Sequence, residues 1–159
     1  MSITVNKAQN QIRETVCAAI DKAKAQGVFP EAEAASFSVE VPADRKNGDY
    51  STNAAMVNAR AFRLPPRKIA EAITDNICLE GTYFEKVGIA GPGFMNFFLN
   101  KKWFADSVQN VLDENDSYGR TDYGAGKRVL VEFVSANPTG DLHLGHARGA
   151  AIGDCICRL

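Results

Sequence analysis

The sequence has no long hydrophobic run, no excess of charge of either sign and few cysteines. No segment approaches the ~20 consecutive apolar residues that a membrane-spanning helix needs, and residues 1–10 lack the apolar stretch of a signal peptide. The 18 Lys and Arg residues are balanced by 19 Asp and Glu residues, so nothing global attracts the chain to nucleic acid or lipid. We therefore expect a cytoplasmic protein without a membrane partner, in which any contact with nucleic acid comes from a local patch.

The motifs of several common sites are also absent. Cys17, Cys78, Cys155 and Cys157 show no C-x-x-C spacing, which favours free thiols over disulfides or a zinc site, and we expect no metal site. The glycines of residues 88–93 do not follow the G-x-G-x-x-G order, and no G-K-[ST] loop occurs. Neither a dinucleotide site nor a P-loop is therefore expected.

What the sequence does contain is the composition of a globular protein of 159 residues, with 45% hydrophobic and 23% charged residues. Stretches with helical periodicity alternate with short runs rich in aromatic and branched residues. The predicted helices cover residues 5–26, 54–62, 66–79 and 101–114, and the predicted strands cover residues 36–41, 83–89 and 94–99. Residues 43–50 are predicted to form a polar loop, after which Ser51, Thr52 and Asn53 offer N-caps to the second helix, and the last two strands are predicted to form a hairpin. This pattern predicts a two-layer α+β domain over residues 1–115, with an antiparallel sheet covered by helices.

The pattern changes after a linker containing Gly and Asp at residues 116–126. Residues 128–134 form an almost continuous apolar run, typical of a parallel strand buried on both faces, and a helical pattern starts at His143. This order predicts the first strand-loop-helix of a Rossmann-like α/β domain, of which residues 127–159 are the incomplete start. Because a strand without neighbours is an exposed edge, we expect this segment to be disordered or to cause self-association.

The loop between that strand and that helix ends in two histidines. His143 and His146 lie three residues apart at the predicted start of the helix, where free backbone N–H groups attract phosphate, and Gly145 lets a ligand approach the backbone closely. Two imidazoles and a helix dipole can stabilise negative charge on a transferring phosphate. The spacing alone also allows half of a metal site or a solvated surface pair.

Around these histidines the sequence reads EFVSANPTG at residues 132–140 and HLGHARG at residues 143–149. These runs closely resemble the first signature of class I aminoacyl-tRNA synthetases, specifically of bacterial arginyl-tRNA synthetases. GDYSTN at residues 48–53 and GPGFMN at residues 91–96 resemble the N-terminal additional domain of the same family. The resemblance covers the whole chain and implies ATP-dependent attachment of arginine to its tRNA through arginyl-adenylate.

The resemblance assigns roles to residues of this signature. It implies that His143, Gly145 and His146 bind ATP, which arrives with Mg²⁺. The two histidines would then stabilise the transition state as the carboxylate of arginine attacks the α-phosphate. Ser135 and Asn137 would bind the backbone groups of L-arginine.

Glu132 would pair with the guanidinium of L-arginine. A carboxylate suits that planar fork of donors because two parallel charge-assisted hydrogen bonds can form. The alternative is a charge at the end of a strand that faces solvent. Asp141 replaces a proline common in similar sequences, and nothing in the sequence explains this difference.

The resemblance also implies an RNA site in the N-terminal domain, for the D-loop at the elbow of the tRNA. Phe94 and Asn96, alternate residues of one predicted strand, would offer a stacking ring and an amide to a splayed base. A basic stretch without acidic residues could hold phosphates. It consists of Arg60, Arg63, Arg67 and Lys68. The alternatives are Phe94 in the core with Asn96 capping a turn, and a solvated helical face.

The sequence lacks other parts of that family: the later lysine signature of the ATP site, most Rossmann strands and the helical anticodon-binding domain. We therefore expect the chain alone not to form arginyl-adenylate, and to bind the tRNA elbow as part of a longer, monomeric enzyme. One alternative is a non-catalytic RNA-binding module, which predicts tRNA binding without ATP binding. Another is an H-x-G-H nucleotidylyltransferase, whose motif usually lies close to the N-terminus, whereas ~140 residues precede it here.

Overall fold

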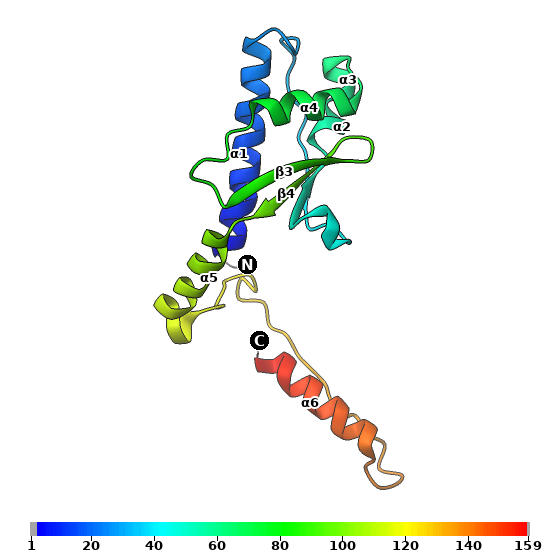
Figure 1. Ribbon diagram of the computed structural model, residues 1–159. Helices are drawn as coiled ribbons and strands as arrows, with labels where there is room; N and C mark the ends of the chain where they lie inside the picture. Colours follow the sequence, from blue (N-terminus) through cyan, green and yellow to red (C-terminus); the bar gives the residue numbers. More distant parts are fainter. Residues whose placement is uncertain (1–2, 159) are drawn as a thin grey trace. The chain divides into compact units, whose positions relative to one another are not determined.

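The computed structural model describes residues 3–158, which divide into two units, one on each side of the Arg120–Thr121 bond. The first unit combines helices with an antiparallel sheet, so the predicted α+β class is confirmed (Figure 1). Its longer helices are α1 (Ile3–Ala25), α4 (Pro66–Asn76) and α5 (Lys101–Glu114), and its short helices are α2 (Ala54–Val57) and α3 (Ala59–Phe62). Its strands are β1 (Val39–Glu40), β2 (Tyr50–Thr52), β3 (Phe84–Ala90) and β4 (Phe94–Leu99).

The strands pair in the order β1–β2–β4–β3, and every pair is antiparallel. β3 and β4 form the predicted hairpin, whereas β1 is shorter than the predicted strand over residues 36–41. β2 lies where the sequence predicts a loop and helix-capping residues. It forms because both of its edges find partners: Thr52 pairs with Val39 of β1 and with Met95 of β4.

α1 supplies a continuous apolar stripe to the core. Its buried residues recur every three or four positions, as an amphipathic helix requires. They are Thr4, Ala8, Ile12, Val16, Ala19, Ile20 and Ala23. The apolar members belong to one buried cluster with Ile69 and Ile73 of α4 and with Met95 and Phe97 of β4. The core therefore lies between these helices and one face of the sheet.

Alternation along β4 separates this buried face from the opposite face. Met95 and Phe97 are fully buried in the core, whereas Phe94 is 40% exposed and shares the opposite face with Asn96. The register aligns one row of residues across that second face. From edge to edge the row is Glu40, Ser51, Asn96 and Gly88.

Two asparagines join the segment between α1 and β1 to the short helices. Asn58 is fully buried, donating from Nδ2 to the carbonyl of Ala54 and accepting at Oδ1 from the N–H of Ala35, both at 2.8 Å. Asn53 accepts at Oδ1 from the N–H of Ser38 at 2.9 Å, so its side chain does not cap α2 as predicted. The predicted helix over residues 54–62 is divided at Asn58 into α2 and α3.

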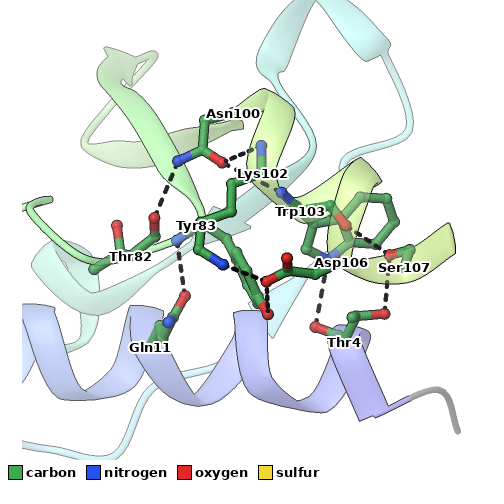
Figure 2. A network of polar contacts seen from close by, with 9 residues as sticks. All are labelled: Thr4, Gln11, Thr82, Tyr83, Asn100, Lys102, Trp103, Asp106 and Ser107. Atoms are coloured by element: carbon green, nitrogen blue, oxygen red, sulfur yellow. Dashed lines mark hydrogen bonds and ion pairs between the residues drawn. The ribbon is translucent and has the colours of Figure 1, made fainter. Parts of the chain in front are cut away.

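A network of polar contacts joins α5 to the rest of the first unit (Figure 2). Lys102 Nζ and Tyr83 Oη both donate to Asp106 Oδ2, at 2.5 Å and 3.0 Å. Trp103 donates from its indole nitrogen to the carbonyl of Thr4 on α1 at 3.3 Å. The hydrogen bonds from Lys102 and then Tyr83 lower the pKa of Asp106, because they stabilise its carboxylate.

In the second unit, α6 (Leu144–Arg158) is the helix predicted to follow the histidine loop. Residues 128–134 form no strand in the structure, so the predicted opening of a Rossmann-like domain is not shown here and stays a prediction. A strand exists through hydrogen bonds to a neighbouring strand, and residues 121–158 contain none. The ring of Phe133 instead occupies the space that a Cβ at Gly153 would need. Along residues 3–158, every helix is too short or too polar to cross a membrane.

Candidate RNA-binding groove and nucleotide loop

A groove of about 640 Å³ opens on the face of the sheet opposite the core. The segment around β1, the strand β2 and the turn that leads into β4 supply its lining. Its side chains with hydrogen-bonding or stacking capacity include Glu40, Ser51, Asn53, Phe94 and Asn96. Its volume lies within the range of small-ligand sites, which is roughly 300–1,000 Å³.

Phe94 and Asn96 both line this groove. Phe94 is 40% exposed and Asn96 pairs within the sheet with Ser51, so the alternative of a core phenylalanine and a turn-capping asparagine does not describe the structure. Asn96 is only 5% exposed, and its Oδ1 accepts from the Ser51 hydroxyl at 2.8 Å. The groove therefore offers a ring whose surface is partly free and an amide with a fixed orientation.

The basic residues of the predicted phosphate site are exposed: Arg60 lies on α3, Arg63 directly follows α3, and Arg67 and Lys68 lie in the first turn of α4. Gly93, in the turn before β4, packs against Pro66, the first residue of α4: a Cβ on Gly93 would lie 3.0 Å from the Pro66 carbonyl. Pro66, which lies between Arg63 and Arg67 of the basic segment, is thus next to the turn that leads into the groove strand β4. One of the charges of this segment is already paired, because Arg67 Nε lies 3.4 Å from Glu71 Oε1. Lys68 has no acidic partner among residues 3–158.

The structure brings His143 and His146 together at the start of α6. Their rings stack with centroids 3.9 Å apart, and each Nδ1 accepts a backbone N–H: His146 from His143, and His143 from Gly145, both at 3.1 Å. In a neutral imidazole with Nδ1 as acceptor, Nε2 carries the proton. Both histidines therefore have an Nε2–H available to donate to a ligand.

The predicted arginine-binding residues are only partly brought together. The hydroxyl of Ser135 donates to the carboxylate of Glu132, and both residues are exposed. Asn137 is exposed too, and its side chain makes no hydrogen bond within residues 3–158. Among the described residues, no group of three His, Cys, Asp or Glu side chains could hold a metal ion, and the four cysteines are free and exposed.

Comparison with known proteins identifies the family. The model described as "Arginyl tRNA synthetase N terminal domain" matches residues 10–99, more than half of the chain. The chain belongs to the arginyl-tRNA synthetase N-terminal domain family. This confirms the family resemblance of the sequence.

The chain is similar to arginine–tRNA ligases along nearly its whole length. It is 46% identical to the enzyme of Acetivibrio thermocellus, over 98% of this chain and 28% of that protein. It is 49% identical to the enzyme of Listeria monocytogenes, over 95% and 27%. A crystal structure of arginyl-tRNA synthetase from Plasmodium falciparum matches 96% of this chain and 28% of its own, with 26% sequence identity and a TM-score of 0.56. The chain thus spans just over a quarter of the length of these relatives.

Sequence reasoning missed two lining residues of the groove in this arginyl-tRNA synthetase domain. Ser51 and Asn53 were expected to cap a helix, but their side chains hydrogen-bond across strands and between segments instead. The signal that could have found them is alternation: Tyr50 and Thr52 are buried, so Ser51 between them faces the other side of the sheet.

Proposed function

We propose that the chain serves ATP-dependent attachment of arginine to its tRNA, and that its first unit binds the D-loop at the elbow of that tRNA. Family membership and the names of the relatives support the overall activity. The observation that carries the elbow-binding part is the groove, because it combines an exposed aromatic ring with an amide, and the turn before β4 meets Pro66 within the basic segment.

In the proposed complex an unpaired base enters the groove and its neighbouring phosphates lie along the basic segment. Phe94 stacks on the base and the amide of Asn96 hydrogen-bonds to its edge, which is how proteins commonly read single-stranded RNA. Arg60, Arg63 and Lys68 are free of acidic partners among the described residues, so their charges remain available for phosphates. Glu40 places an acid in the groove, which favours a base there over a phosphate.

The histidine loop is proposed to bind ATP as a substrate. The Nε2–H groups of His143 and His146 would donate to its phosphates and stabilise the charge that develops when the arginine carboxylate attacks the α-phosphate. Gly145 keeps the start of α6 free of a side chain. Because the described residues offer no cluster of metal ligands, Mg²⁺ would arrive on the phosphates of the nucleotide.

The arginine site is proposed at Glu132, Ser135 and Asn137, with Glu132 facing the guanidinium. Glu132 accepts a hydrogen bond from the Ser135 hydroxyl, and this bond would have to break when arginine binds. The site also requires residues 128–134 to become a strand of a Rossmann-like sheet, which neighbouring strands would induce. In this proposal residues 127–159 are the start of the catalytic domain of a longer, monomeric enzyme.

The elbow-binding proposal is tested by titrating the chain with an arginine tRNA and a non-arginine tRNA over a series of salt concentrations. We expect tighter binding to the arginine tRNA and weaker binding by Asn96→Ala. Asn6→Ala, which removes an exposed asparagine of α1 outside the groove, is the matched control. Equal, steeply salt-dependent binding to both tRNAs would mean phosphate attraction alone and would contradict the proposal.

The nucleotide part has a separate test. Titration with ATP and Mg²⁺ should shift the NMR signals of the imidazole rings of His143 and His146, while an equal concentration of adenosine, which lacks phosphates, should not. Unshifted signals with intact tRNA binding would favour the alternative of a non-catalytic RNA-binding module.

A further inference from the structure

One row across the exposed face of the sheet sets the orientation of the amide in the groove. Asn96 lies between Ser51 on β2 and Gly88 on β3. The Ser51 hydroxyl donates to Asn96 Oδ1 at 2.8 Å, whereas Gly88 offers no side chain on the other side. Within residues 3–158 no group accepts a hydrogen bond from Asn96 Nδ2. The protein thus engages the oxygen of this amide and leaves its two N–H donors for a ligand.

A carboxamide has nearly the same shape after a half-turn that exchanges its oxygen and nitrogen, so shape alone does not decide which atom meets the ligand. Asn96 also has little room to move, since only 5% of the residue is exposed. A buried polar atom without a partner is costly, so a contact that holds this amide matters. A hydroxyl can donate or accept, and in the structure the Ser51 hydroxyl donates to Oδ1, which leaves Nδ2 for a ligand.

A second asparagine of the groove has the same arrangement. Asn53 Oδ1 accepts the backbone N–H of Ser38 at 2.9 Å. Because a backbone N–H can only donate, the oxygen of Asn53 is fixed on that side and its NH₂ group is left over. Two of the three asparagines that line the groove, Asn53 and Asn96, therefore have their oxygens bound by the protein and their donors free among the described residues; the third is Asn47.

We propose that Ser51 is a positioning residue for base selection: its hydroxyl holds the Asn96 carboxamide so that Nδ2–H donates to an acceptor atom, a carbonyl oxygen or ring nitrogen, of the bound base. This inference rests on the proposed function of the groove. Ser51 acts through Asn96 and need not touch the RNA. Without Ser51 the amide turns to present either atom, so the groove loses its preference among bases.

The test uses four tRNA transcripts that differ only at one unpaired D-loop position, chosen as the position where substitution changes wild-type affinity most. Dissociation constants are measured for wild type, Ser51→Ala, Ser51→Thr and Asn96→Ala. Ser117→Ala, at an exposed serine outside the groove, is the matched control. Circular dichroism confirms that each variant is folded.

We expect Ser51→Ala to weaken binding of the preferred base about 3- to 10-fold, the effect of one lost hydrogen bond, and to change the poorest base less than about twofold. Ser51→Thr, which keeps the hydroxyl, should retain the wild-type order of bases. A uniform loss for all four bases, no loss, or a threonine variant that behaves like alanine overturns the role of Ser51.

The same experiment separates failure of this inference from failure of the proposed function. If Asn96→Ala weakens binding and Ser51→Ala leaves the base preference unchanged, only the inference about Ser51 is wrong. If Asn96→Ala binds all four transcripts like wild type, the proposed base contact is wrong and the inference falls with it. A readout without RNA is the NMR signal pair of the Asn96 side-chain amide, which should move in Ser51→Ala and stay in place in Ser117→Ala.

Discussion

Replacing Phe94 by alanine should weaken tRNA binding strongly while changing folding stability little. The residue is 40% exposed at the start of β4 and lines the groove, so a large part of its ring is free to meet a base. Stacking of a base on an aromatic side chain contributes about 1–3 kcal/mol by alanine substitution. This corresponds to an affinity loss of about 5- to 150-fold, since about 1.4 kcal/mol is tenfold.

The stability cost should be well below the roughly 3–5 kcal/mol of a fully buried phenylalanine, because the ring is not part of the core. Fluorescence anisotropy with a labelled arginine tRNA measures the affinity, and urea denaturation measures the stability. Phe104→Ala, at a 54% exposed phenylalanine of α5 outside the groove, should bind like wild type.

Phe94→Leu distinguishes stacking from general apolar contact, because leucine keeps much of the volume and lacks the ring. If Phe94→Leu binds like wild type, stacking is not the interaction. If Phe94→Ala binds like wild type, no base contacts this ring and the reasoning from exposure to recognition is wrong.

Three further outcomes are expected. Lys68→Ala should weaken binding to all tRNAs alike, since it removes one phosphate contact. The slope of log affinity against log salt should become shallower by about one, and an unchanged slope over the same salt series would contradict this. Tyr83→Phe should raise the pKa of Asp106 toward its ordinary value, measured by NMR of the carboxyl carbon. Because the pKa of Asp106 is lowered in the folded state, its carboxylate adds stability above the ordinary pKa of aspartate, and this stability is lost as the pH falls through the lowered pKa. The Tyr83→Phe variant should therefore lose less stability on acidification than the wild type. An equal loss would refute the assignment. Phe97→Ala should lower the free energy of unfolding by about 3–5 kcal/mol, because the ring is fully buried between the sheet and the helices; denaturation midpoints close to wild type would show that the core is placed wrongly.

The parts of the fold that are predictable from the sequence are those with a local signal. The apolar stripe of α1 and the alternation along the β3–β4 hairpin lie within single segments, so their periodicity is readable. The same alternation correctly places Phe94 and Asn96 together on one face of a strand.

Other features depend on partners far along the chain. β2 has three residues and exists through β1 and β4, so its short alternation is too weak a signal to predict a strand without those partners. Residues 128–134 show the opposite case, since their apolar run predicts a strand but no neighbouring strand is present to pair with it. The orientation of the Asn96 amide depends on a hydroxyl 45 residues away, which only the register of the sheet reveals.

The contact between Gly93 and Pro66 has a geometric consequence for the proposed RNA site. A glycine with φ +137° lets the hairpin turn meet the backbone at the start of α4, where even a methyl group would be crowded. The hairpin turn is therefore fixed against the backbone between Arg63 and Arg67. In the proposed complex, an RNA loop would fit only when the distance between its splayed base and its phosphates matches the distance that this contact sets.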